Sequence, residues 1–97
     1  MKALKFRPKA RTDLDGIWAY SVENWGTDQA QTYFRGIQRV LDRLIDGTGI
    51  SLSAENVLER CRKVRVASHV VYFQEDSDEI VVIRILHQRM DVARSLR

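Results

Sequence analysis

The fold is decided by the last third of the chain, which reads RCRKVRVASHVVYF at residues 60–73, EDSDE at residues 75–79 and IVVIRILHQRMD at residues 80–91. A basic alternating strand, an apolar strand, an acidic turn and a second apolar strand follow one another with short turns between them. This order predicts a three-stranded antiparallel meander, followed by a short tail that begins at residue 87.

Two amphipathic helices are expected ahead of this meander. A short strand at residues 4–6 ends near Pro8, and proline suits the first turn of a helix. The first helix should end before Gly26 and the second before Gly47. The stripes at helical spacing are Leu14, Ile17, Trp18, Ser21 or Val22, and Trp25 in the first helix, and Ala30, Tyr33, Phe34, Ile37, Val40, Leu41, Leu44 and Ile45 in the second. We interpret the aromatic residues of both stripes as core.

These elements predict an α+β domain in the order β-α-α-β-β-β, with a helical hairpin packed on a twisted antiparallel sheet. Residues 1–97 are expected to form one domain, because so short a chain buries one modest core. Alternation along the last strand places Val81, Ile83 and Ile85 on one face and Val82, Arg84 and Leu86 on the other. This second face is apolar enough to need a cover, supplied by the tail or by a partner. The expected core between hairpin and sheet contains Trp18, Ile37, Leu41, Val64 and Ile83, and the loop at residues 47–57 is expected to be pinned by Ile50, Leu52 and Val57.

The composition favours a cytoplasmic protein without membrane segments. Apolar runs stay short of the roughly 18 residues that a transmembrane helix needs. The N-terminal residues lack the apolar stretch of a signal peptide. The single Cys61 has no partner for an internal disulfide, and we interpret it as a passive strand residue.

Positive charge is concentrated in the same region as the meander. Residues 1–59 hold eight Lys/Arg and eight Asp/Glu, whereas residues 60–97 hold eight against five, which accounts for the formal net charge of +3. A basic sheet and tail of this kind indicate an acidic partner. Ordinary solvated strand faces are the alternative.

Few residues in the sequence form a recognisable catalytic or metal-binding pattern. The GTG run at residues 47–49 follows a helix rather than a strand, which does not fit a phosphate-binding loop. One cysteine and two distant histidines do not supply a metal site, so we expect no metal and no cofactor. What remains is a set of basic residues, namely Arg62, Lys63, Arg65, His69, Arg84, His87 and Arg89. They could hold a phosphate and move a proton, as in a ribonuclease, or they could line a protein-binding surface.

Several short motifs occur in one order along the chain. They are FRPKARTDL at residues 6–14, IWAY at 17–20, ENWG at 23–26, VRVASHVVYF at 64–73 and VIRILHQRMD at 82–91. In this order and spacing they resemble the toxins of the RelE/ParE superfamily, and the ParE branch in particular, over nearly the whole chain. Two departures are the loop GTGISL at residues 47–52, where the family usually has a proline-rich stretch, and Ala67, where it often has glycine.

The resemblance implies the toxin of a bacterial type II toxin–antitoxin system. ParE-like toxins are associated with inhibition of DNA gyrase, and so of DNA replication, and with neutralisation by a ParD-like antitoxin. The RelE branch instead cleaves mRNA on the ribosome, with basic sheet residues and a tyrosine or histidine near the C-terminus. No tyrosine follows Phe73 in this chain. The resemblance therefore favours a gyrase-binding inhibitor that is not an enzyme and does not itself read nucleic-acid sequence, with the endoribonuclease as the alternative.

Three sets of candidate residues follow from these two functions. For an endoribonuclease they are Arg62, Arg65, Arg84 and His87; for target binding by an inhibitor they are His87, Arg89, Met90 and Arg94; for antitoxin binding they are Lys63, Arg65, Val82, Arg84 and Leu86. The tail is expected to be open to a target, and residues 91–97 are expected to be removable without loss of the fold.

Overall fold

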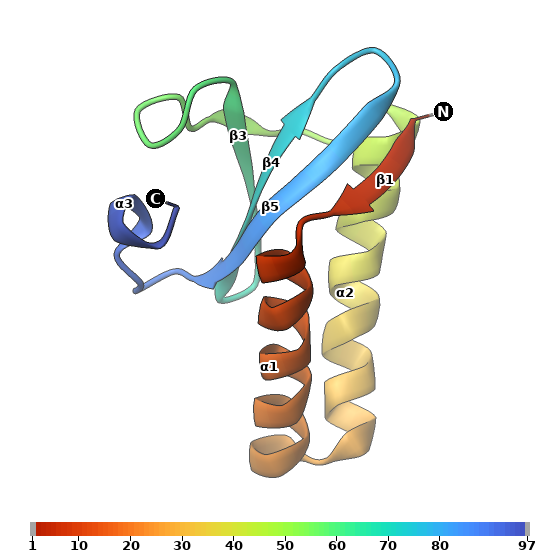
Figure 1. Ribbon diagram of the computed structural model, residues 1–97. Helices are drawn as coiled ribbons and strands as arrows, with labels where there is room; N and C mark the ends of the chain where they lie inside the picture. Colours follow the sequence, from red (N-terminus) through yellow and green to blue (C-terminus); the bar gives the residue numbers. More distant parts are fainter. Residues whose placement is uncertain (1, 97) are drawn as a thin grey trace.

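The computed structural model describes residues 2–96 and contains a helical hairpin, a five-stranded sheet and a short C-terminal helix (Figure 1). In chain order the elements are β1 (Ala3–Phe6), α1 (Pro8–Trp25), α2 (Thr27–Asp46), β2 (Leu52–Ser53), β3 (Cys61–Val66), β4 (His69–Glu75), β5 (Glu79–His87) and α3 (Val92–Ser95). The α+β class, the two long helices and the meander are as predicted from the sequence. The two-residue strand β2 and the helix α3 were not predicted.

Two glycines set the bounds of the hairpin helices. Gly26 has φ 91° and ψ 166° and separates α1 from α2, so that the chain turns within one residue. Gly47 ends α2 in the left-handed conformation at φ 84°. Residues with a side chain rarely adopt either conformation, which explains why both helices end where the sequence predicted. Pro8 begins α1, where its missing N–H costs no hydrogen bond.

The sheet is mixed, and the prediction of an antiparallel sheet is wrong at one edge. The strand order is β1-β5-β4-β3-β2, and β1 runs parallel to β5 with Ala3 opposite Glu79 and Phe6 opposite Val82. The other three pairings are antiparallel. Residue alternation reveals that residues 3–6 form a strand, but strand direction depends on how the helical hairpin returns the chain to the sheet.

A β-bulge in β5 changes which side chains face the helices. Tyr72 pairs with Arg84, whereas the next residue, Phe73, pairs with Val82, so Ile83 is the extra residue. Val82 and Ile85 therefore both pack under the hairpin, while Ile83 packs on the opposite face. The predicted division of β5 into two alternating faces is thus wrong, because strict alternation fails at a bulge.

The larger core lies between the hairpin and the sheet. Its buried members are Ala10, Ile37, Leu41, Leu44, Val66, Val71, Phe73, Ile80, Val82 and Ile85, with Val64 partly buried against them. Ile37, Leu41 and Val64 are where the sequence predicted them.

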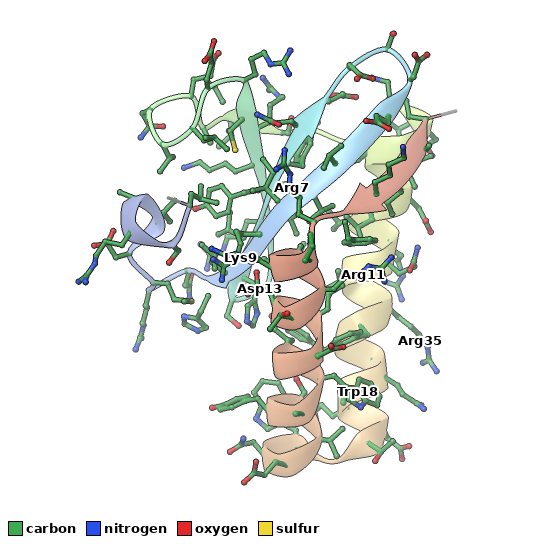
Figure 2. All side chains as sticks on the ribbon, viewed as in Figure 1. Arg7, Lys9, Arg11, Asp13, Trp18 and Arg35 are labelled. Atoms are coloured by element: carbon green, nitrogen blue, oxygen red, sulfur yellow. The ribbon has the colours of Figure 1, made fainter. Side chains whose placement is uncertain are left out.

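Trp18 and Trp25 lie outside this core. The half of the hairpin that contains them extends beyond the sheet (Figures 1 and 2). They are 36% and 46% exposed, and Trp18 contacts the ring of Phe34 edge-on at a centroid distance of 5.2 Å. Helical spacing predicted their stripe correctly, but the sheet is too short to cover its distal part.

A second core lies on the other face of the sheet and is covered from within the chain. Ala54, Cys61, Tyr72, Ile83 and Leu86 are its buried members. The covering side chains are Val57, Leu58, Val70, Val92 and Leu96, so the tail supplies part of the cover that the sequence required. Of the loop residues expected to pin residues 47–57, Val57 packs here, whereas Ile50 and Leu52 are exposed. Burial raises the pKa of the Cys61 thiol, as expected of a passive core cysteine.

None of the helices within residues 2–96 combines the length and the hydropathy that crossing a bilayer requires.

Candidate functional site

Arg84 is held in a structural ion pair. Its Nε and Nη2 atoms each donate to the Asp13 carboxylate at 2.8 Å, and Nη1 donates to the Ser95 carbonyl at 2.7 Å. The hydrogen bonds to Asp13 raise the pKa of Arg84 above its usual value. Asp13 also accepts the backbone N–H of Ile85 at 2.9 Å. The guanidinium therefore links α1, β5 and α3, and it is not available to a substrate.

The other predicted nuclease residues do not converge with Arg84. Arg62 donates to the hydroxyl and carbonyl oxygens of Ser51 at 2.7 and 2.8 Å, which holds the loop before β2. Arg65 is exposed and donates to the Ala67 carbonyl at 2.8 Å. Because side chains alternate along β3, Arg62 and Arg65 lie on opposite faces of the sheet. The structure does not bring the four residues Arg62, Arg65, Arg84 and His87 into one site.

The structure instead pairs the two histidines across neighbouring strands. His69 begins β4 and lies opposite His87 of β5, with their ring centroids 5.4 Å apart. Tyr33 hydrogen-bonds His69 Nδ1 at 2.5 Å, and His87 Nδ1 accepts the Arg89 backbone N–H at 3.2 Å. Burial, and then the charge of His87, lower the pKa of His69. Both effects favour the neutral form of the His69 imidazole.

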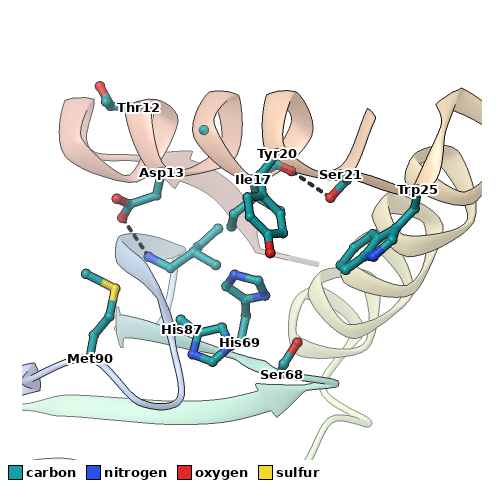
Figure 3. Close-up of a pocket in the computed structure, with 12 residues that line it drawn as sticks. Thr12, Asp13, Ile17, Tyr20, Ser21, Trp25, Ser68, His69, His87 and Met90 are labelled. Carbon is teal, nitrogen blue, oxygen red and sulfur yellow. Dashed lines mark hydrogen bonds between the residues drawn. The ribbon is translucent and has the colours of Figure 1, made fainter. Parts of the chain in front are cut away.

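A cavity of about 500 Å³ opens beside this pair, between α1 and the ends of β4 and β5. We call it the His-pair cavity; it is lined by Thr12, Asp13, Gly16, Ile17, Tyr20, Ser21, Trp25, Ser68, His69, Ile85, His87 and Met90. Figure 3 shows Tyr20 and Trp25 pointing from α1 toward the two imidazole rings, with Met90 at the other end of the cavity.

Two of the predicted target-binding residues, His87 and Met90, line this cavity. Arg89 lies between them in the chain and is exposed. Arg94 is exposed on α3 and its backbone N–H is bound to Asp91. Tyr20 was not predicted to be a site residue, and Trp25 was predicted to be core. Tyr20 lies off the apolar stripe of α1, and an aromatic residue off that stripe is the signal that could have placed it at a surface.

Three separate shallow pockets involve residues of α2, β3 or both, and we call this set the α2–β3 groove. One contains Trp25 and Gly36 with Val66, a second contains Val40 and Arg43 with Val64 and Arg65, and a third contains Ile50, Leu52 and Lys63, again with Val64 and Arg65. Two of the predicted antitoxin-binding residues, Lys63 and Arg65, therefore lie in one groove.

The remaining three antitoxin-binding candidates are not accessible surface residues. Val82 and Leu86 are 0% and 1% exposed, in the first and second cores respectively. Arg84 is bound to Asp13 and Ser95. We expected Val82 and Leu86 to be partly exposed because strand alternation left one apolar face uncovered. The bulge and the C-terminal tail bury them.

A family model described as the ParE toxin of the type II toxin–antitoxin system parDE matches residues 4–92. The chain belongs to this ParE toxin family. Similar proteins include Toxin ParE1 of Mycobacterium tuberculosis (strain ATCC 25618 / H37Rv), 34% identical over 90 residues and 92% of each chain. Toxin ParE1 of Caulobacter vibrioides (strain ATCC 19089 / CIP 103742 / CB 15) is 33% identical over 96 residues and 99% of each chain.

A solved structure shares the ParE fold described above. It is titled chromosomal ParDE TA system from P. aeruginosa, and its superposition has a TM-score of 0.74 over 90% of this chain and 96% of that one. At 24% identity this match supports the fold. Family membership, with the toxin component of a type II toxin–antitoxin system as its function, rests on the family model and the curated relatives.

Proposed function

We propose that this ParE-family toxin inhibits DNA gyrase by binding it, without catalysing a reaction of its own. The observation that carries this proposal is the dispersal of the predicted nuclease residues. A ribonuclease needs groups that hold the phosphate and transfer protons at one place. Here Arg84 is engaged by Asp13 and Ser95, and Arg62 and Arg65 lie on opposite faces of the sheet.

The proposed target-binding surface consists of His87, Arg89 and Met90 at the end of β5, with Arg94 nearby in sequence on α3. The first three are partly or largely exposed, and the positive charges of Arg89 and Arg94 suit an acidic region of a target protein. The buried free thiol of Cys61 is compatible with action in a reducing cytoplasm, where gyrase works.

A ParD-like antitoxin is proposed to bind along the α2–β3 groove. In the part of the chain that the structure describes, β2 pairs only with Arg62 and Lys63, so the outer edge of residues 64–66 carries no strand. Exposed Ile50 and Leu52 add apolar surface, and Arg43, Lys63 and Arg65 add positive charge. An acidic, amphipathic segment that orders on binding fits this groove.

The endoribonuclease remains the second candidate because the structure places His69 and His87 side by side, and two imidazoles can act as acid and base.

Two assays of the purified toxin distinguish these functions: gyrase supercoiling, and primer extension on mRNA from a translating extract. We expect lost supercoiling or trapped cleaved DNA, with no discrete cuts in mRNA. Cuts in mRNA with normal supercoiling would refute the gyrase proposal.

A conservative variant, His87→Gln, sharpens this test. Glutamine keeps a hydrogen-bonding side chain but cannot exchange a proton near neutral pH. Binding to gyrase should fall by less than about tenfold, the cost of weakening one hydrogen bond. Cleavage of mRNA by an acid–base mechanism should instead fall by about 10²–10⁴-fold.

A further inference from the structure

Gly16 lies in the interior of α1, and no contact within residues 2–96 explains why this position is a glycine. Glycine is among the least favourable residues in a helix interior. A Cβ placed on Gly16 meets no atom within 4 Å, so close packing does not require glycine there. The open space beside it is the His-pair cavity, which Gly16 lines. The missing side chain leaves the cavity accessible along α1.

Three large side chains surround the opening of this cavity. Tyr20, Trp25 and Met90 are 59%, 46% and 46% exposed. Tyr20 and Trp25 contact each other edge-on, with ring centroids 5.8 Å apart. Exposed aromatic and methionine side chains grouped around a concave surface are typical of protein–protein contacts.

The inner wall of the cavity is polar. Ser68, His69 and His87 line it, and the exposed Arg89 lies between the lining residues His87 and Met90 in the chain. The one carboxylate among the lining residues, Asp13, is already paired with Arg84. The exposed Arg89 guanidinium is therefore available to a carboxylate on a partner.

We propose that the His-pair cavity receives one apolar side chain, aromatic or branched, from an acidic surface of the toxin's target protein. The inference rests on the proposed target-binding surface, which includes His87, Arg89 and Met90. A volume of about 500 Å³ accommodates one large side chain together with its neighbouring backbone. Carboxylates beside that side chain face His87 and Arg89, while Tyr20 and Trp25 exclude water around it.

The target, rather than the antitoxin, is assigned to this cavity because of position: the proposed target-binding residues His87 and Met90 line it. The α2–β3 groove has its own exposed apolar residues and its own basic residues, Arg43, Lys63 and Arg65. Trp25 lies between the groove and the cavity and lines both. Two partners can therefore occupy separate surfaces that meet at one tryptophan.

The test fills the cavity from Gly16. Gly16→Ala and Gly16→Leu add side chains where the structure is open, and both residues favour the helix, so the thermal midpoint should stay the same or rise. Ala19→Leu places the same leucine side chain at another exposed position of α1 and is the matched control. Each variant is induced in cells to score growth arrest. Purified proteins are compared by circular dichroism and by affinity for a ParD-like antitoxin that neutralises the unmodified toxin.

We expect Gly16→Leu to weaken growth arrest at least about tenfold, because the added side chain occupies the space that the partner's side chain needs. Gly16→Ala should weaken it less, Ala19→Leu should behave as the unmodified toxin, and all three should keep their affinity for the antitoxin. The proposal is overturned if a folded Gly16→Leu toxin arrests growth fully, or if it also loses its affinity for the antitoxin. If Gly16→Leu does not fold, the same two outcomes are read from Gly16→Ala. If Gly16→Leu abolishes growth arrest but the unmodified toxin leaves gyrase supercoiling intact, the cavity proposal stands and the gyrase proposal fails.

Discussion

The Asp13 carboxylate binds the Arg84 guanidinium through two hydrogen bonds of 2.8 Å, and it also accepts the backbone N–H of Ile85. This contact joins the first helix to β5 just beyond the β-bulge, where β1 no longer pairs with that strand. Through Ser95, Arg84 also links the tail to the same point. The sequence predicted that Arg84 lies on a substrate-binding or antitoxin-binding surface. The structure shows instead that Arg84 stabilises the fold.

Asp13→Asn should destabilise the fold. Breaking a buried ion pair costs about 3–5 kcal/mol. The Arg84 and Asp13 side chains are 16% and 13% exposed, which lets water screen the remaining charge. We therefore expect a loss of about 2–3 kcal/mol, a large part of the roughly 5–15 kcal/mol that stabilises a domain. Urea unfolding measures it, with exposed Asp15→Asn as the control; equal stability of both variants would contradict the structural role.

The stability of the fold should fall as the pH drops below about 6.5, because the half-buried surroundings of His69 favour its neutral imidazole. The folded pKa of His69 lies below its unfolded value, so the unfolded chain takes up a proton first. This contribution is complete above the unfolded pKa and is lost as the pH falls through the folded pKa. Its slope is at most about 1.4 kcal/mol per pH unit for one proton.

Urea unfolding between about pH 5 and pH 7.5 measures this slope, over the range in which an ordinary histidine titrates. His69→Asn keeps a polar group near Tyr33 but does not titrate, so its slope should be flatter over the same range. Asp46 and Asp76, whose carboxyl pKa values are lowered, titrate at more acidic pH, so they do not contribute to this slope. An unchanged slope in His69→Asn would assign the effect to another group.

Removing residues 91–97 should unfold or strongly destabilise the protein, contrary to what the sequence suggested. Val92 and Leu96 pack against the second core, and the Ser95 carbonyl accepts from Arg84. Removing these two partly buried side chains costs about 1–2 kcal/mol each, less than the 2–5 kcal/mol lost when a fully buried side chain is truncated. The thermal midpoint should fall by several degrees, whereas exposed Arg94→Ala should leave it unchanged. A truncated chain that melts like the full one would show that α3 is not part of the core.

Gly36→Leu should weaken binding of a ParD-like antitoxin. Gly36 lines the α2–β3 groove, and the space around a Cβ at this position is open, so the added side chain is expected to project into the groove. We expect at least a tenfold loss of affinity, measured by calorimetry. Arg65→Glu should lower the affinity further and reduce its dependence on salt. Gln38→Leu, at an exposed position of the same helix, is the control, and equal affinities would place the antitoxin elsewhere.

The sequence alone determined the local elements and the family. Proline and glycine positions set the bounds of α1 and α2, and alternating apolar residues marked β3, β4 and β5, because these signals act within a few residues of the chain. The ordered motifs from Phe6 to Asp91 indicated the ParE branch. These properties depend on neighbouring residues, which a sequence displays directly.

The tertiary structure decided strand direction, burial and the grouping of the site. The bulge at Ile83 moved Val82 into the first core, and the short sheet left Trp25 exposed. His69 and His87 face each other across β4 and β5 although they lie far apart in the chain. Such contacts depend on strand register and on how far one element extends over another. Residue spacing within a single element contains no information on strand register or on how far one element covers another. The sequence could therefore identify His87 and Met90, but not the cavity that they share with Tyr20 and Trp25.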